Sequence, residues 1–370
     1  MKSYQEAVTA FEADRNQLAS LGIVLPSVRS YTPQHFKRDF DGAMDEMGMA
    51  MDALPTLTTD PNAGVPAILT TMIDPTIIRV LFSPNKAAQI VGEQKKGTWI
   101  DDTILFPIVE NTGEVSSYGD YSNNGSTNAN TNWPARQNYL YQTIKQYGER
   151  ELERAGLAKI NWVGELDMSA ATVMHKYENL TYFFGVAGLQ NYGLLNDPGL
   201  SAALTPALKG YGGVKWINNG VIVASANEVY LDIESLFLQL VNQSGGLIEA
   251  TDKLVLALSP QSAVALTATN SFNVNVSDLL KKNFPNLEVI TAVQYGQLSS
   301  SNPQGVTGGN FIQMIAPTVE GQQTAFAAFS EKMRAHAIVK ELSAFKQKVS
   351  GGTWGTVIRQ TFAISSMIGV

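Results

Sequence analysis

The chain has 370 residues, enough to bury one large or two medium hydrophobic cores, and it has no cysteine, which excludes disulfides, thiolate catalysis and cysteine-ligated metal sites. Only 16% of its residues are charged, against roughly 25% in ordinary soluble domains, so either partner proteins cover much of the surface or the chain is an enzyme with an uncharged surface. The net charge is −7 and no basic run is longer than Lys95-Lys96 or Lys281-Lys282, which excludes tight binding to a phosphate backbone and leaves only weak contact with nucleic acid.

The first 96 residues predict a helix, an irregular segment and then short helices. Apolar residues from Tyr4 to Leu18 recur at helical spacing, whereas prolines and methionines interrupt any order from Ser27 to Ala67. We expect this irregular segment to lie as an arm on a surface, including that of a neighbouring copy, or its methionines to form a short helix in the chain's own core. Residues 68–96 predict one or two short helices, with Ser83-Pro84 as a helix start.

Residues 97–148 predict a long β-hairpin. Strand-forming residues flank it from Thr98 to Val109 and from Tyr139 to Ile144, while the tip from Asn111 to Asn132 has almost no aliphatic side chain. About 13 residues per strand give a ribbon about 40 Å long, against a radius of gyration of about 21 Å for a compact body of this length. An isolated two-stranded ribbon is marginal in water, so we expect this one to project onto a partner molecule.

The strongest helical pattern runs from Glu149 to Gly185, with apolar residues three or four apart; Gly156 and Gly164 mark where the helix bends or a first segment ends. Strands at 221–224, 253–258 and 287–292 then alternate with helices at 228–244 and 259–269, which predicts a compact α/β lobe. Residues 333–369 predict further strands, joined through Gly351-Gly352.

Motifs for enzymatic chemistry are nearly absent. Ser83 and Lys86 have the Ser-x-x-Lys spacing of a serine nucleophile activated by lysine, but its companion motifs are missing. The three histidines, His35, His175 and His336, do not have the spacing of paired metal ligands, and no phosphate-binding glycine motif is present. We therefore expect no enzyme, no catalytic residue, no metal and no cofactor. The apolar stretches are too short to span a bilayer and no secretory signal follows Lys2, so we expect a soluble, cytoplasmic origin without a membrane partner.

Two stretches and the order of elements resemble the major capsid proteins of tailed bacteriophages, whose fold is shared with herpesviruses and encapsulins. Phe183–Asn196 resembles the segment after the family's spine helix, where a glycine-rich turn precedes an Ile-Leu-Asn-like strand. Gly351–Ile364 resembles the closing strand, Gly-Gly-x-x-Val-x-Arg-x-Pro-x-Ala-Ile, with an insertion before Val357 and Gln360-Thr361-Phe362 where a proline is usual. The order of arm, hairpin, long helix, lobe and strands covers nearly the whole chain.

The resemblance implies an α+β capsid fold with an N-terminal arm, an extended loop, a spine helix with a peripheral β-sheet, and an α/β axial domain. Its parts would be an arm at 1–67, helices leading into the peripheral domain at 68–96, the extended loop at 97–148, the spine-helix region at 149–199, the axial domain at 200–325 and the closing strands at 326–370.

The function that the resemblance implies is structural. Axial domains would meet in pentamers and hexamers, and extended loops would lie over adjacent subunits to lock an icosahedral head around double-stranded DNA. The expected location is the virion, after assembly in the host cytoplasm with scaffolding, portal and decoration proteins. Because residues 97–144 contain no lysine, isopeptide crosslinking from the loop is not expected and the locking would be non-covalent. Two alternatives stay open: an encapsulin-type cargo compartment, and a soluble hydrolase using Ser83 and Lys86.

The residues expected at contacts between subunits are aromatic side chains of the extended loop and its flanks, together with the loop's single arginine. They are Trp99, Phe106, Tyr118, Tyr121, Trp133, Arg136 and Tyr139.

Overall fold

The computed structural model describes residues 85–158 and 160–370. Those up to Ala155 and from Asn161 to Val370 belong to the larger of two compact units. The arm predicted at 1–67, its amphipathic helix and most of the segment at 68–96 lie outside the described residues, as does Ser83. From that segment the structure describes helix α4 (Ala87–Val91) and strand β1 (Glu93–Lys95). No helix in the described ranges is long and apolar enough to cross a membrane.

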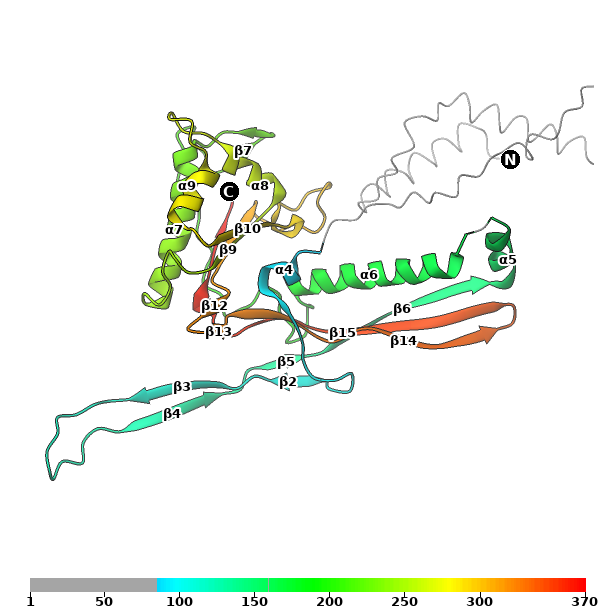
Figure 1. Ribbon diagram of the computed structural model, residues 1–370, viewed down its shortest axis with the longest axis horizontal. Coiled ribbons are helices and arrows are strands. Elements are labelled where there is room, and N and C mark those ends of the chain that lie inside the picture. The colour runs from blue at the N-terminus through cyan, green and yellow to red at the C-terminus, as the bar shows by residue number, and fades with distance from the viewer. Residues whose placement is uncertain (1–84, 159) are drawn as a thin grey trace, which may run out of the picture. The chain divides into compact units, whose positions relative to one another are not determined.

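A four-stranded sheet is built around one long β-hairpin (Figure 1). Its order is β1–β14–β15–β6, with β14 at Ala325–Glu341, β15 at Ala344–Ile358 and β6 at Tyr139–Gly148. β1 pairs with β14 in parallel, and the other pairs are antiparallel. Leu342, with a left-handed φ of 52°, lies in the turn that joins β14 to β15. The predicted join at Gly351-Gly352 is wrong, because both glycines lie inside β15, where the missing side chains admit close neighbours.

Helix α6 (Trp162–Phe184) covers one face of this sheet, as Figure 1 shows. Tyr139 and Tyr141 of β6 pack on Tyr177 of α6, with ring centroids 6.1 and 4.9 Å apart. The predicted helical stretch is broken rather than bent: α5 spans Glu149–Leu157, and Asn161 begins α6 by accepting a hydrogen bond from the Gly164 N–H at 3.2 Å.

A second four-stranded sheet forms the α/β lobe. Its order is β10–β9–β11–β16, with β10 at Leu287–Thr291, β9 at Leu254–Leu258, β11 at Phe311–Ile315 and β16 at Ile364–Ile368. β10 and β9 are parallel, and β11 is antiparallel to both β9 and β16. The prediction that residues 326–370 all form closing strands of the peripheral domain is wrong for the last strand. β14 and β15 belong to the first sheet, whereas β16 pairs with β11 in the lobe.

In the lobe, the helix predicted at 228–244 is present, the one predicted at 259–269 is a short helix followed by a 3-10 turn, and α9 (Val276–Asn283) was not predicted. The longest of these helices, α7 (Ala226–Ser244), begins with a capping box between Ser225 and Glu228 and ends at Gly245 in a left-handed conformation. Its buried face, with Ile233, Leu236 and Leu240, packs into one cluster with side chains of the sheet. The other short elements are α8 (Pro260–Val264), α9 (Val276–Asn283), β7 (Ile217–Asn218), β8 (Val221–Ile222), β12 (Thr318–Val319), β13 (Gln322–Gln323), and the 3-10 turns Ala265–Thr267, Val293–Tyr295 and Thr361–Ala363.

The predicted hairpin is present, but it is shorter and interrupted. β2 (Thr103–Leu105) pairs with β5 (Ala135–Gln137), and β3 (Ile108–Gly113) pairs with β4 (Thr127–Asn132). The predicted return flank at 139–144 does not pair with the outgoing one. As part of β6 it pairs with β15, because its alternate side chains pack on α6 there. The six-residue outer pair spans about 20 Å, and with β2 and β5 the paired arms run over eleven residues, Thr103–Gly113, or about 36 Å.

Gly193 lies where the chain turns back along the end of α6. An added Cβ would lie 2.2 Å from both the carbonyl carbon and the oxygen of Phe183. We expect Gly193→Ala to lower the free energy of unfolding by about 1–3 kcal/mol in urea titrations, because the backbone must move apart. Gly156→Ala is the control: its added Cβ meets nothing within 4 Å, so it should be neutral or stabilise the protein by about 0.5–1 kcal/mol. Equal effects of the two substitutions would contradict this close approach.

Candidate intersubunit surface

The ribbon formed by β3, β4 and their connecting tip leaves every residue from Pro107 to Trp133 exposed (Figure 1). Val115, Tyr118 and Tyr121 are each at least 92% exposed, and Trp133 is 55% exposed. Large apolar side chains at such exposure, gathered on a two-stranded ribbon without a core, are typical of a surface that another molecule covers.

The base of the ribbon is held firmly to its own subunit. Phe106 packs edge-on against Phe326, with ring centroids 6.2 Å apart, beside the buried Trp354. Arg136 forms a 2.7 Å ion pair with Asp197, both side chains being nearly buried, and its guanidinium lies 4.9 Å from the centre of the Tyr192 ring. The ribbon therefore extends from a fixed base.

The seven residues predicted at subunit contacts divide into two groups. Trp99 packs against His336 and Arg334 of β14, and Tyr139 packs against Tyr177, so these two, with Phe106 and Arg136, contact their own chain. Burial, and then hydrogen bonding with Tyr139, raise the pKa of Tyr177 to about 12. The other three, Tyr118, Tyr121 and Trp133, are exposed on the ribbon. A role between subunits stays a prediction for all seven.

The ribbon and its approach carry only negative charge. From Gly97 to Ala135 the acidic residues are Asp101, Asp102, Glu110, Glu114 and Asp120, and there is no lysine or arginine. Glu110, Glu114 and Asp120 are exposed on the ribbon itself. A surface that receives this ribbon is therefore expected to be positive or neutral.

The sheet face opposite α6 has the complementary character. Residues paired across antiparallel strands point to the same side, so Lys346 and Lys348 share this face with their partners Gln146 and Ile144. Val339 of β14, opposite Lys346, joins them. Ile144 and Val339 are 59% and 55% exposed, and Lys348 is exposed with no ion pair among the described residues. We call Gln142, Ile144, Gln146, Val339, Lys346 and Lys348 the outer sheet face.

Sequence reasoning missed the outer sheet face because it assigned Ile144 to the hairpin. In the structure Leu140, Gln142, Ile144 and Gln146 of β6 are exposed and alternate with residues that α6 covers, over Tyr139–Tyr147, as in a strand with one buried face. The sequence has no such signal, because polar Thr143 and Lys145 lie on the covered side and apolar Leu140 and Ile144 on the exposed side.

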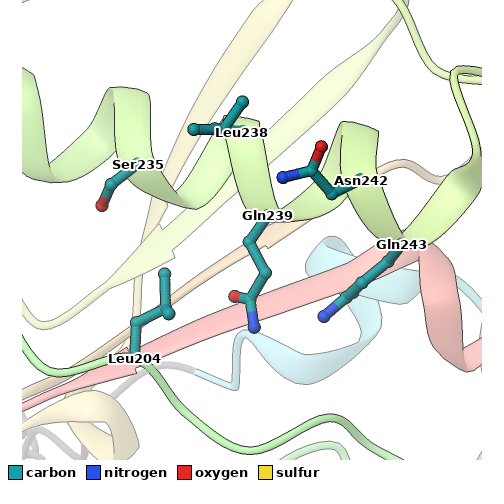
Figure 2. Close-up of a pocket in the computed structure, with 6 residues that line it drawn as sticks. All are labelled: Leu204, Ser235, Leu238, Gln239, Asn242 and Gln243. Atoms are coloured by element: carbon teal, nitrogen blue, oxygen red, sulfur yellow. The ribbon is translucent and has the colours of Figure 1, made fainter.

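An open groove lies on the lobe, where Figure 2 shows five side chains from successive turns of α7 beside Leu204. None of the six lining residues is ionisable, so acid–base chemistry has no group there. In the part of the chain that the structure describes, no cluster of three or more metal-ligating side chains occurs. Lys86 donates to the Gln89 side-chain oxygen at 2.7 Å, and its predicted partner Ser83 lies outside the described residues.

The fold is that of phage capsid proteins. The capsid protein of the Myoviridae phage XM1 matches with a TM-score of 0.66 at 13% identity, covering 84% of this chain and 100% of that chain. The capsid of a native GTA particle matches with a TM-score of 0.55 at 11% identity, over 86% and 100% of the two chains. Microbacterium phage Oxtober96 gives a TM-score of 0.54 at 12% identity, over 82% and 97%. Such identities establish the shared α+β capsid fold and no more.

The chain belongs to the Pa193 gp26 major capsid protein family, whose model matches residues 56–369. It is therefore a structural protein of the virion that associates with its own copies in phage-type shells. No curated protein matches it in sequence.

Proposed function

We propose that this protein assembles as pentamers and hexamers into an icosahedral head that encloses double-stranded DNA, and that the ribbon of each subunit lies on the outer sheet face of a neighbour. The parts predicted from the sequence keep their proposed roles within the corrected bounds: an arm at 1–67, an extended loop that ends before β6, an axial domain at 200–325 that also includes β16, and peripheral parts that include β6, β14 and β15. Scaffolding, portal and decoration proteins are proposed partners during assembly in the host cytoplasm.

One observation carries the locking role of the ribbon: it exposes Val115, Tyr118 and Tyr121 almost completely while its base is fixed by buried contacts. Complementary charge supports the outer sheet face as the receiving surface. The ribbon has three carboxylates and no cation, whereas the face carries Lys348, which has no ion pair among the described residues, and Lys346, which is paired with Glu341, around two exposed aliphatic side chains. Without a lysine between Gly97 and Ile144, this locking is non-covalent.

The test is assembly of the purified full-length chain and its Lys348→Glu variant, followed by negative-stain microscopy and light scattering. The unmodified chain should form closed, symmetric particles. The variant should form fewer, because a carboxylate then faces the acidic ribbon, and raised salt should reduce the difference by screening. Each exposed charge pair contributes only about 0.2–1 kcal/mol, but every subunit of a shell repeats it.

Lys348→Gln is the matched control, because it removes the charge without reversing it. The number of particles it forms should lie between that of the unmodified chain and that of Lys348→Glu. Normal particles from Lys348→Glu at low salt would rule out the outer sheet face as the receiving surface. A strictly monomeric unmodified chain would instead contradict the shell itself. Particles from the natural source should contain double-stranded DNA; an enzyme cargo in its place would favour the encapsulin-type alternative.

A further inference from the structure

A cluster of ionisable side chains lies buried between α6 and the sheet it covers. Glu178 and Tyr182 of α6 meet Glu93 of β1 and Lys332 of β14. The Glu178 side chain is 4% exposed and that of Glu93 is 19% exposed. The role of the ribbon does not involve this cluster, which joins the helix to two strands far from it in sequence.

The hydrogen bonds of the cluster do not balance if both carboxyl groups are ionised. The Tyr182 hydroxyl oxygen lies 2.8 Å from a carboxyl oxygen of Glu93 and 2.8 Å from one of Glu178. A tyrosine hydroxyl has one hydrogen to donate, and an ionised carboxylate only accepts. One of the two carboxyl groups must therefore supply a hydrogen of its own to the shared hydroxyl.

The surroundings decide which carboxyl group is protonated. The second oxygen of Glu93 is paired with the Lys332 ammonium, which stabilises the ionised form. Glu178 is the more buried of the two, and burial is the largest cause of its raised pKa, with the Glu93 charge acting in the same direction. Hydrogen bonding from Tyr182 and the charges of Lys332 and His175 act against this rise without reversing it.

The other ionisable groups around Glu178 come from α6 and β6. His175 of α6 lies with Nδ1 3.3 Å from Glu178 Oε2, and its side chain is half exposed. The Tyr141 hydroxyl of β6 is buried, has no hydrogen-bond partner among the described residues, and has a raised pKa, chiefly from burial and then from Glu178 and Tyr177. Burial also raises the pKa of Tyr182, so neither phenol ionises to relieve the cluster at neutral pH.

We propose that Glu178 holds a proton at neutral pH, donates it as a hydrogen bond to Tyr182, and thereby fastens α6 to β1 and β14 through a proton-dependent latch. Tyr182 in turn donates to the ionised Glu93, which Lys332 neutralises. Loss of the proton would leave two negative carboxylates competing for one hydroxyl hydrogen in a buried site. The hydrogen-bonded link from Glu178 through Tyr182 to Glu93 is then lost, while the apolar packing of α6 on β14 remains.

The sign of the pH effect follows from the direction of the pKa shift. A carboxyl group whose pKa is higher in the folded than in the unfolded state makes the folded state bind more protons. The contribution to stability is thus present below the ordinary carboxyl range of about pH 4–5 and is lost as pH rises through the raised pKa. Alkaline conditions weaken the latch and acidic conditions retain it.

The test compares thermal unfolding of the full-length chain from about pH 5 to about pH 9 with that of two variants. Glu178→Gln keeps the shape and donates a hydrogen at every pH, so its midpoint should resist the alkaline fall of several degrees expected of the unmodified chain. Glu234→Gln, which changes an exposed carboxyl group on α7, is the matched control and should keep that fall.

A second measurement uses only the unmodified chain and therefore does not depend on whether a variant folds. Infrared spectra of the unmodified chain at neutral pH should contain the carbonyl band of one protonated carboxylic acid, which disappears as the alkaline transition is crossed. Burial raises the pKa of the Glu178 carboxyl group, to which the band is assigned. Absence of the band at neutral pH, or an equal alkaline fall in Glu178→Gln, would overturn the proposal.

Discussion

Removing Glu114–Thr131, which is the tip of the ribbon and all of β4 except Asn132, should leave a soluble subunit that no longer forms stable shells. Every deleted residue is exposed and none belongs to the hydrophobic clusters of the two sheets, so the fold loses no core contact. Covering a tyrosine or valine side chain contributes about 1.5–3 kcal/mol. Loss of Val115, Tyr118 and Tyr121 from one contact between subunits therefore raises the dissociation constant of that contact by several factors of ten.

The measurements are sedimentation and electron microscopy after assembly, with thermal unfolding of the variant subunit as the control for folding. A milder variant, with serine at Val115, Tyr118 and Tyr121, keeps the length of the ribbon and should still weaken the shells. Shells of normal heat resistance from the deletion variant would show that the ribbon has no locking role.

Replacing Asp232 by alanine should be the most destabilising single substitution in the lobe. Asp232 is 2% exposed and accepts hydrogen bonds from Lys209 at 2.5 Å and from the Trp216 indole at 2.6 Å. Without it, Lys209 keeps a buried charge with no partner, at a cost of about 3–5 kcal/mol. Urea unfolding of the full-length chain measures the loss.

The control for this prediction is the double variant Lys209→Met with Asp232→Leu. A buried ion pair exchanged for apolar residues of similar size is often neutral, so the double variant should lose much less than Asp232→Ala alone. The double variant should still lose about 1–3 kcal/mol of unfolding free energy, because the Trp216 indole N–H has lost its acceptor. If Asp232→Ala lowers the free energy of unfolding by no more than the double variant does, the unpaired Lys209 charge is not the cause of the destabilisation.

The elements that could be predicted from the sequence are those with local signals. The continuous apolar run Leu254–Leu258 forms the fully buried β9, and the Ser225–Glu228 box with Gly245 bounds α7. Pairing between distant segments has no such signal. Nothing near Tyr139–Gly148 in sequence indicates that it pairs with Ala344–Ile358, and so these residues were wrongly assigned to the return strand of the hairpin.

The same distinction holds for the candidate site. A tip with almost no aliphatic residue beyond Val115 predicts exposure, and Val115, Tyr118 and Tyr121 are exposed. Phe106 and Arg136 find their partners, Phe326 and Asp197, 220 and 61 positions away, and only the folded chain reveals such contacts. The Glu93–Tyr182 hydrogen bond joins residues 89 positions apart, so local sequence patterns could not predict it either.

The paired glycines inside β15 have a mechanical consequence. A methyl group on Gly352 would come 2.2 Å from Ser330 Oγ, and one on Gly351 would come 2.8 Å from the Lys332 carbonyl oxygen. Sliding β15 by one position past β14 would push a bulkier residue into this narrow gap and turn its alternate side chains over. The close approach at Gly351 and Gly352 thus fixes the register of β15 against β14, and through the pairing of β15 with β6 it fixes the strand that follows the ribbon.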